Sequence, residues 1–234
     1  LALKNGAEEK ARAALKKAFG DRRRLEDVND YLTLGALYLR SQVTALPSQN
    51  KDVLKTATLL LSQMRQFEKD LGQFGKDLTP PKASSFRYKH SRFTTDYHLN
   101  YGILLRAVAA TLREYNPAAI SKMLEYAERD ALYAPIETRV GRERVLALPR
   151  KQWDRAYTDA AITHFELALK KDRHSEAAYE LIDLCESLWD GSDNNRRALL
   201  KEMIERHAPA YLEAPHEDQR MARVRRVLNK VNQA

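Results

Sequence analysis

The side chains with the greatest potential for chemistry are one cysteine and six histidines. Cys185 lies in the apolar-rich stretch 179–189, where a free cysteine usually packs as a small hydrophobic residue, so we expect it to be buried and unreactive. A single cysteine also excludes an intramolecular disulfide and a cysteine-based zinc finger. The histidines follow no metal-ligand spacing such as His-Glu-x-x-His, and His164 stands beside Phe165 on a predicted packing helix. We therefore expect no metal site, no cofactor and no catalytic centre.

Arg92 and His98 have the one spacing that suggests an enzyme. Some helical ribonucleases carry an Arg that is followed, after four to six residues, by a His, and this pair fits that spacing. The chain contains 24 Arg, so matches of this kind are expected by chance. Phe93 also stands where those enzymes usually have a polar residue. The spacing therefore does not predict a ribonuclease.

Positive charge is concentrated in four clusters of the sequence. The net charge is +8, from 40 basic and 32 acidic residues, which favours an anionic partner but is modest for a dedicated nucleic-acid-binding protein. In the segment 86–93, cations alternate with aromatic side chains, a pattern that suits phosphates and stacked bases or the carboxylates of an acidic peptide. Each cluster is also compatible with an ordinary solvated surface. The clusters comprise Arg22, Arg23 and Arg24; Arg87, Tyr88, Lys89 and Arg92; Arg139, Arg142, Arg144, Arg150 and Lys151; and Arg220, Arg223, Arg225, Arg226 and Lys230.

Membrane-spanning and targeting signals are not visible in the sequence. No apolar run reaches the roughly 18 residues that a membrane-spanning helix needs. Residues 1–6 lack the apolar core of a signal peptide. The sequence starts without Met and leaves open whether a targeting or membrane segment precedes Leu1. With its single thiol, the chain is expected in the cytoplasm.

Helices must position all of these residues, because apolar residues recur at helical spacing and only eight Gly and eight Pro punctuate the chain. We expect one all-α domain over residues 1–234, with nine to ten helices and an irregular loop at about 72–93. Toward the C-terminus, the pattern predicts helices over 153–171 and 175–189, and a third from Asp193 or Asn194 to about 207. Pro209 and Pro215 are expected to break the chain before a last helix at about 217–232.

Two segments resemble tetratricopeptide repeats, which are helix hairpins of about 34 residues. Residues 31–38 read Tyr-Leu-Thr-Leu-Gly-Ala-Leu-Tyr, which is similar to the first helix of such a repeat. Residues 161–172 resemble the second helix, with small Ala161 and Ala168 flanking the large Phe165. Small residues let a paired helix approach, and large residues fill the groove beside it. Asp172 is followed by Arg173, where the family commonly has Pro.

A third segment, Tyr97 to Gly102, has a similar pattern and is followed by a predicted helix at about 117–131. Gly35 and Gly102 are 102 − 35 = 67 residues apart, close to twice the repeat length of about 34. The resemblance implies a right-handed α-solenoid of antiparallel helix hairpins. Such arrays bury contacts between neighbours and present a concave face.

The resemblance implies partner binding rather than catalysis. We expect a scaffold that binds an acidic or amphipathic protein segment in a basic groove. The residues expected to contact the partner are Arg87, Tyr88, Lys89, Arg92, Arg139, Arg142 and Arg144. The alternative is a nucleic-acid-binding helical protein that uses the basic and aromatic clusters.

The last predicted helix is amphipathic. Its apolar positions are Met221, Val224, Val227 or Leu228, and Val231, while arginines occupy another face. We expect this helix to cap the end of the array with its apolar side.

Overall fold

The computed structural model describes 58, 61–62, 95, 97–110, 112, 132–136, 150–171 and 175–233 of the 234 residues. Within these residues the protein is all-helical: 91% are in helix and none is in a strand. The all-α prediction is confirmed to that extent. The expected loop at 72–93 and the expected N-terminal helices lie outside the described residues, and the expected number of helices stays a prediction.

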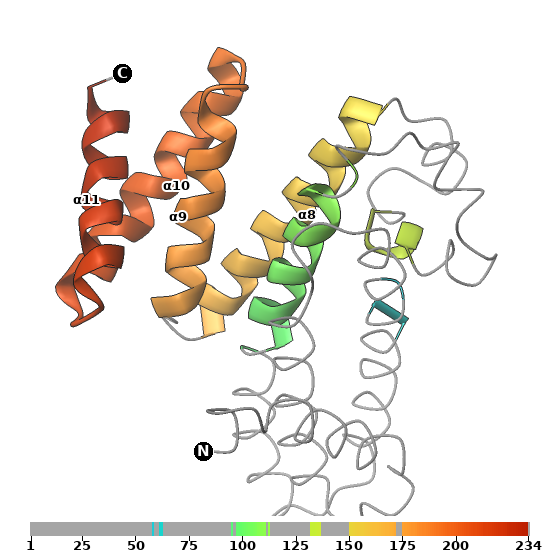
Figure 1. Ribbon diagram of the computed structural model, residues 1–234, viewed down its shortest axis with the longest axis horizontal. Helices are drawn as coiled ribbons and strands as arrows, with labels where there is room; N and C mark the ends of the chain where they lie inside the picture. The colour runs from blue at the N-terminus through green and yellow to red at the C-terminus, as the bar shows by residue number, and fades with distance from the viewer. Residues whose placement is uncertain are drawn as a thin grey trace, which may run out of the picture.

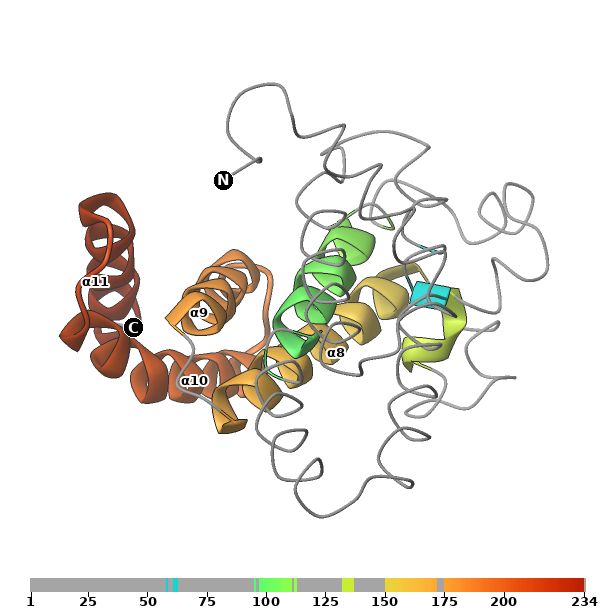
Figure 2. The same ribbon diagram turned by 90° about the horizontal axis from the view of Figure 1, so that it is seen from below.

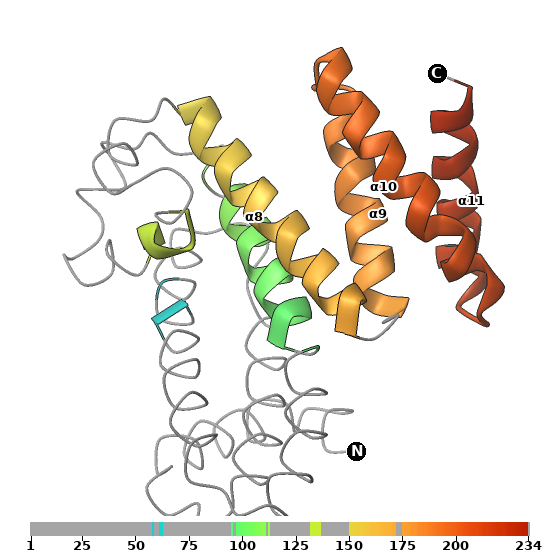
Figure 3. The same cartoon turned by 180° about the vertical axis from the view of Figure 1, so that it is seen from behind.

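Four complete helices form the C-terminal part of the chain (Figure 1). They are α8 (Arg150–Lys171), α9 (Ser175–Trp189), α10 (Asn194–Glu213) and α11 (Asp218–Asn232). A further helical segment, 97–110, lies beside α8 in Figures 1 and 3. None of the helices described is long and apolar enough to cross a membrane.

Local signals account for where these helices begin. Asp193 is the N-cap of α10, and its carboxylate accepts a hydrogen bond of 2.8 Å from the backbone N–H of Arg196, so one otherwise unpaired amide is satisfied. Gly191 lies in the exposed turn between α9 and α10. The short turn makes α9 and α10 antiparallel neighbours, as Figure 1 shows.

Pro209 does not end α10, contrary to the expectation from the sequence. The helix continues through this residue to Glu213. A proline inside a helix loses one backbone hydrogen bond and costs about 3 kcal/mol or more. Here Ala208 and Tyr211 are buried on either side of the proline, and their packing offsets that cost.

Each of the four complete helices packs on its neighbour along the chain, and one further contact joins α9 and α11. α9 packs on α8 and α10, and α11 packs on both α10 and α9. The segment 97–110 contacts α8 through Gly102 and α9 through Arg106. Figure 2 shows the result: 97–110, α9 and α11 lie on one side, while α8 and α10 lie on the other.

The segment 97–110 and α8 approach each other very closely at Gly102. Phe165 is fully buried, and a Cβ built on Gly102 lies only 2.5–2.9 Å from carbons of the Phe165 ring. A real Cβ does not approach that closely, so the two helices come together at this distance only because residue 102 is Gly. On either side of Phe165, Ala161 and Ala168 are fully buried, as the alternation of small and large residues predicted.

Candidate functional site

The seven residues predicted to contact a partner lie outside the described residues. They are Arg87, Tyr88, Lys89, Arg92, Arg139, Arg142 and Arg144. The cluster at 22–24 lies outside them too. The C-terminal cluster on α11 is described in full, and it lies beside paired charges on α9.

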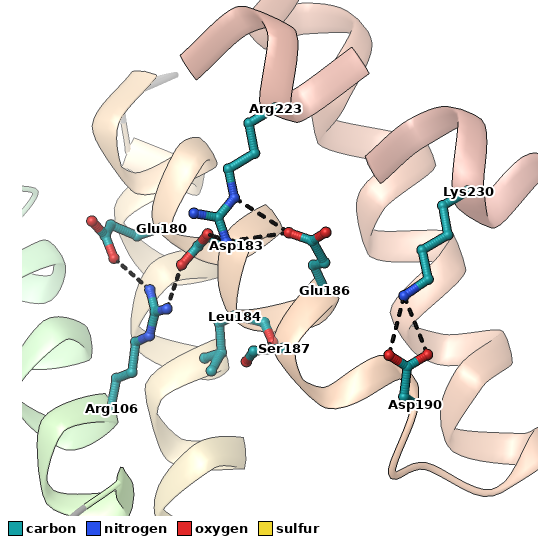
Figure 4. Close-up of polar contacts among 9 residues, drawn as sticks. All are labelled: Arg106, Glu180, Asp183, Leu184, Glu186, Ser187, Asp190, Arg223 and Lys230. Atoms are coloured by element: carbon teal, nitrogen blue, oxygen red, sulfur yellow. Dashed lines mark hydrogen bonds and ion pairs between the residues drawn. The ribbon is translucent and has the colours of Figure 1, made fainter. Parts of the chain in front are cut away.

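A row of carboxylates on α9 binds arginines from the two neighbouring helices, and we call this set the charged ladder (Figure 4). The carboxylates belong to Glu180, Asp183 and Glu186, whose spacing of three residues places them along one side of the helix. The arginines are Arg106, from 97–110, and Arg223, from α11. The ladder therefore joins three helices on the same side of the structure.

Asp183 is the shared member of the charged ladder. One carboxylate oxygen accepts a hydrogen bond from Arg106, and the other forms an ion pair with Arg223. Arg106 also donates a hydrogen bond of 2.8 Å to Glu180, and Arg223 donates one of 3.2 Å to Glu186. Asp183 is 8% exposed, so its charge depends on these two partners rather than on water.

The electrostatics of the charged ladder follow from burial and from pairing. Burial raises the pKa of Glu180, Arg106 lowers it, and the nearby Asp183 raises it again, so that the net shift is upward. Burial lowers the pKa of Arg223, but Asp183 and Glu186 outweigh that effect, and the pKa is raised. Both guanidinium groups are held by carboxylates of the chain itself, so this face of the described region is not a free basic groove.

The structure divides the five cations of α11 into two kinds. Arg223 belongs to the charged ladder, and Lys230 forms an ion pair of 3.2 Å with Asp190. Arg220 lies 4.7 Å from the centroid of the Tyr179 ring and 3.7 Å from Glu217. Arg225 and Arg226 are exposed instead. Three of these five cations therefore interact with groups of the chain itself.

The apolar positions of α11 face the protein. Val224, Val227 and Val231 are buried, while Met221 and Leu228 are partly buried. The sequence did not decide whether Val227 or Leu228 belongs to the apolar face of the helix. In the structure, Val227 is the more buried of the two. The predicted amphipathic pattern is confirmed, with α11 covering α10 and α9.

His98 and His164 form a pair that sequence spacing did not reveal. Their Nδ1 atoms are 2.9 Å apart, and the centroids of the His164 and Tyr101 rings are 4.2 Å apart. The two residues are 66 positions apart, so no local motif brings them together. Within the described residues, His, Cys, Asp and Glu side chains form no group of three that could hold a metal ion. His164 packs between helices, as its place beside Phe165 predicted.

Cys185 is fully buried, in agreement with the prediction. Burial raises the pKa of its thiol to about 12, and Glu166 adds to the effect. The thiolate is the nucleophilic form of cysteine, so the folded protein holds this residue in its inert form at neutral pH.

Comparison with known proteins gives no matching family model, no matching curated protein and no matching solved structure. The function is therefore argued from the geometry of the chain. In the described part, that geometry consists of stacked helices joined by arginine–carboxylate pairs, with two exposed arginines on the last helix.

Proposed function

We propose that the chain is a non-catalytic scaffold, a right-handed solenoid of tetratricopeptide-like hairpins that binds an acidic or amphipathic protein segment. The observation that supports this most strongly is the packing of the C-terminal helices, in which α8, α9 and α10 each pack on their successor and α11 also packs on α9. In a stack of hairpins, contacts of this kind join neighbours and leave alternate helices exposed along one face. The segment 97–110, α9 and α11 lie on one side in this way (Figure 2).

The charged ladder indicates where an acidic segment would not bind. Arg106 and Arg223 already hold Asp183, so a carboxylate from outside would have to displace a nearly buried aspartate from them. A partner gains more from arginines that have no carboxylate of the chain to bind. The proposed contacts remain the clusters around Arg87 and Arg142, which the sequence predicts.

The test is a double charge reversal, Arg142→Glu with Arg144→Glu, in a binding assay with immobilised chain and nuclease-treated lysate. We expect the proteins captured by the wild type to be lost, because reversed charges repel an acidic segment. The matched control is Lys170→Glu with Lys201→Glu, which makes the same change in net charge on α8 and α10. Unchanged capture by the Arg142 and Arg144 variant would contradict the proposed groove.

The same assay separates the nucleic-acid alternative. If capture disappears on nuclease treatment, and a gel shift shows binding that weakens steeply with salt, phosphate contacts explain the interaction better. That alternative rests on the alternating cations and aromatic residues at 86–93 of the sequence.

A further inference from the structure

Arg225 and Arg226 differ from every other arginine whose side chain the structure describes. Each of the others forms an ion pair, a hydrogen bond or both with a group of the chain. Arg225 and Arg226 are exposed and have no such partner within the described residues. They are neighbours in the sequence, so two positive charges stand side by side without a carboxylate to offset them.

The two arginines line a shallow hollow on the outer face of α11. The hollow has a volume of about 620 Å³, and its other lining residues include Ala222, Asn229 and Gln233. Two arginines for charge and two amides for hydrogen bonds give this face the donors that a carboxylate-bearing chain requires. Small Ala222 leaves room for a backbone to lie against the helix.

We infer that this outer face of α11 is a docking surface for an acidic protein segment, with Arg225 and Arg226 each binding a carboxylate. The inference deepens the proposed scaffold function and rests on it. A planar guanidinium donates two parallel hydrogen bonds to one carboxylate, so adjacent arginines select a segment with two acidic side chains near one another.

The surroundings favour a protein segment over a nucleic acid. Glu217 and Asp218 stand at the beginning of α11, and Asp190 holds Lys230 toward its end. A nucleic acid that followed the helix would pass these carboxylates, while two arginines supply few of the phosphate contacts that binding needs. A short acidic segment reaches both arginines and avoids the carboxylates.

The experiment measures the fluorescence anisotropy of a short labelled peptide of alternating Glu and Ala, titrated with the full chain at low salt. We expect the Arg225→Glu, Arg226→Glu double variant to bind about tenfold more weakly than the wild type, because two attractions become repulsions. Lys170→Glu with Lys201→Glu makes the same change in net charge on other helices, and we expect less than about a twofold effect, as for exposed charges at a distance. Circular dichroism checks that each variant is folded.

Five outcomes overturn the inference. The first is equal weakening in both double variants, which would show that net charge alone drives binding. The second is that single-stranded DNA binds more tightly than the peptide and that this binding depends on the same arginines. The third is a wild-type dimer that the Arg225 and Arg226 reversal makes monomeric, since the occupant would then be a second copy.

The fourth outcome separates this inference from the proposed function. Suppose that the Arg142→Glu, Arg144→Glu variant no longer binds the peptide, while the Arg225 and Arg226 variant still binds it. This result would support the proposed groove and contradict the α11 docking surface. The fifth outcome is a wild type that does not bind the peptide at all, which contradicts the α11 surface, while capture from the lysate still tests the groove by itself.

Discussion

The segment 97–110 makes two interfaces that depend on different physics. Against α8, Gly102 lies directly on the fully buried ring of Phe165, so shape decides the contact. Against α9, Arg106 reaches Glu180 and Asp183, so charge pairing decides it. The first interface fixes how close two helices approach and tolerates no added volume. The second fixes which residues face each other and tolerates small shifts in distance, because side chains can follow.

Gly102→Val gives the largest expected effect. The new side chain would overlap the Phe165 ring, whose burial leaves it little space to move, so we expect the free energy of unfolding to fall by about 3 kcal/mol. Urea denaturation followed by circular dichroism measures the loss.

Two variants control for Gly102→Val. At Gly191 an added Cβ meets nothing within 4 Å, so Gly191→Ala should change stability by less than about 0.5 kcal/mol. Phe165→Leu, introduced into the Gly102→Val protein, should restore part of the loss because it removes the clashing ring. A Gly102→Val protein as stable as the wild type would mean that the two helices do not meet as described.

Asp183→Ala is expected to have a smaller effect, at the charged interface. It leaves Arg106 and Arg223 with Glu180 and Glu186 as remaining partners, so we expect a loss of about 1–2 kcal/mol rather than the cost of a bare buried charge. Asp183→Asn, which keeps the shape of the side chain, separates the charge from the packing. The measurement is again the free energy of unfolding in urea.

Asp190→Ala is the matched control for Asp183→Ala. Asp190 also lies at the interface with α11, but its side chain is 83% exposed, and its ion pair with Lys230 should contribute less than about 0.5 kcal/mol. Equal losses for the two aspartates would show that burial does not distinguish the charged ladder from surface pairs.

Glu180→Gln is expected to change stability least at neutral pH. Because the pKa of Glu180 is raised on folding, the folded protein keeps this proton at pH values where the unfolded chain has released it. The contribution of Glu180 to stability therefore falls as the pH rises from its ordinary pKa of 4.5 through the raised value. Gln does not titrate, so the variant should gain stability relative to the wild type over that window and differ from it by less than about 0.5 kcal/mol at neutral pH.

Urea denaturation below pH 4.5 and at neutral pH tests whether the variant gains stability relative to the wild type as the pH rises. A Glu180→Gln protein that loses as much stability at neutral pH as Asp183→Ala would mean that the bond to Arg106 outweighs burial. In the charged ladder, the attraction between opposite charges would then contribute more to stability than the burial of Glu180 costs.

Local sequence signals predicted the C-terminal helices well. The expected helix over 175–189 has the bounds of α9, and Asp193 caps α10 as one of two suggested residues. The end of α10 was predicted wrongly, because a proline is a local signal, whereas the burial of Tyr211 beyond it is a property of the folded protein. The repeat pattern at 161–172 predicted small residues around Phe165, but the contact with Gly102 needed the fold to reveal it.

The charged ladder could not be predicted from the sequence. Arg106 and Asp183 are 77 positions apart, and only the spacing of the α9 carboxylates is visible locally. Arg223 looked like a member of a surface patch because neighbouring arginines surround it in the sequence. Its pairing with Asp183 and Glu186 depends on the packing of α11 on α9, which spacing alone does not encode.

Asp183 also makes residues 106 and 223 interdependent, although they lie on different helices and each binds the opposite side of one carboxylate. Once Asp183 has lost one arginine, the other becomes its sole neutralising partner, so removing both should cost something other than the sum of two single losses. In related chains, these three positions should therefore vary together rather than one at a time. A lineage that replaced the aspartate by an apolar residue would be free to lose both arginines.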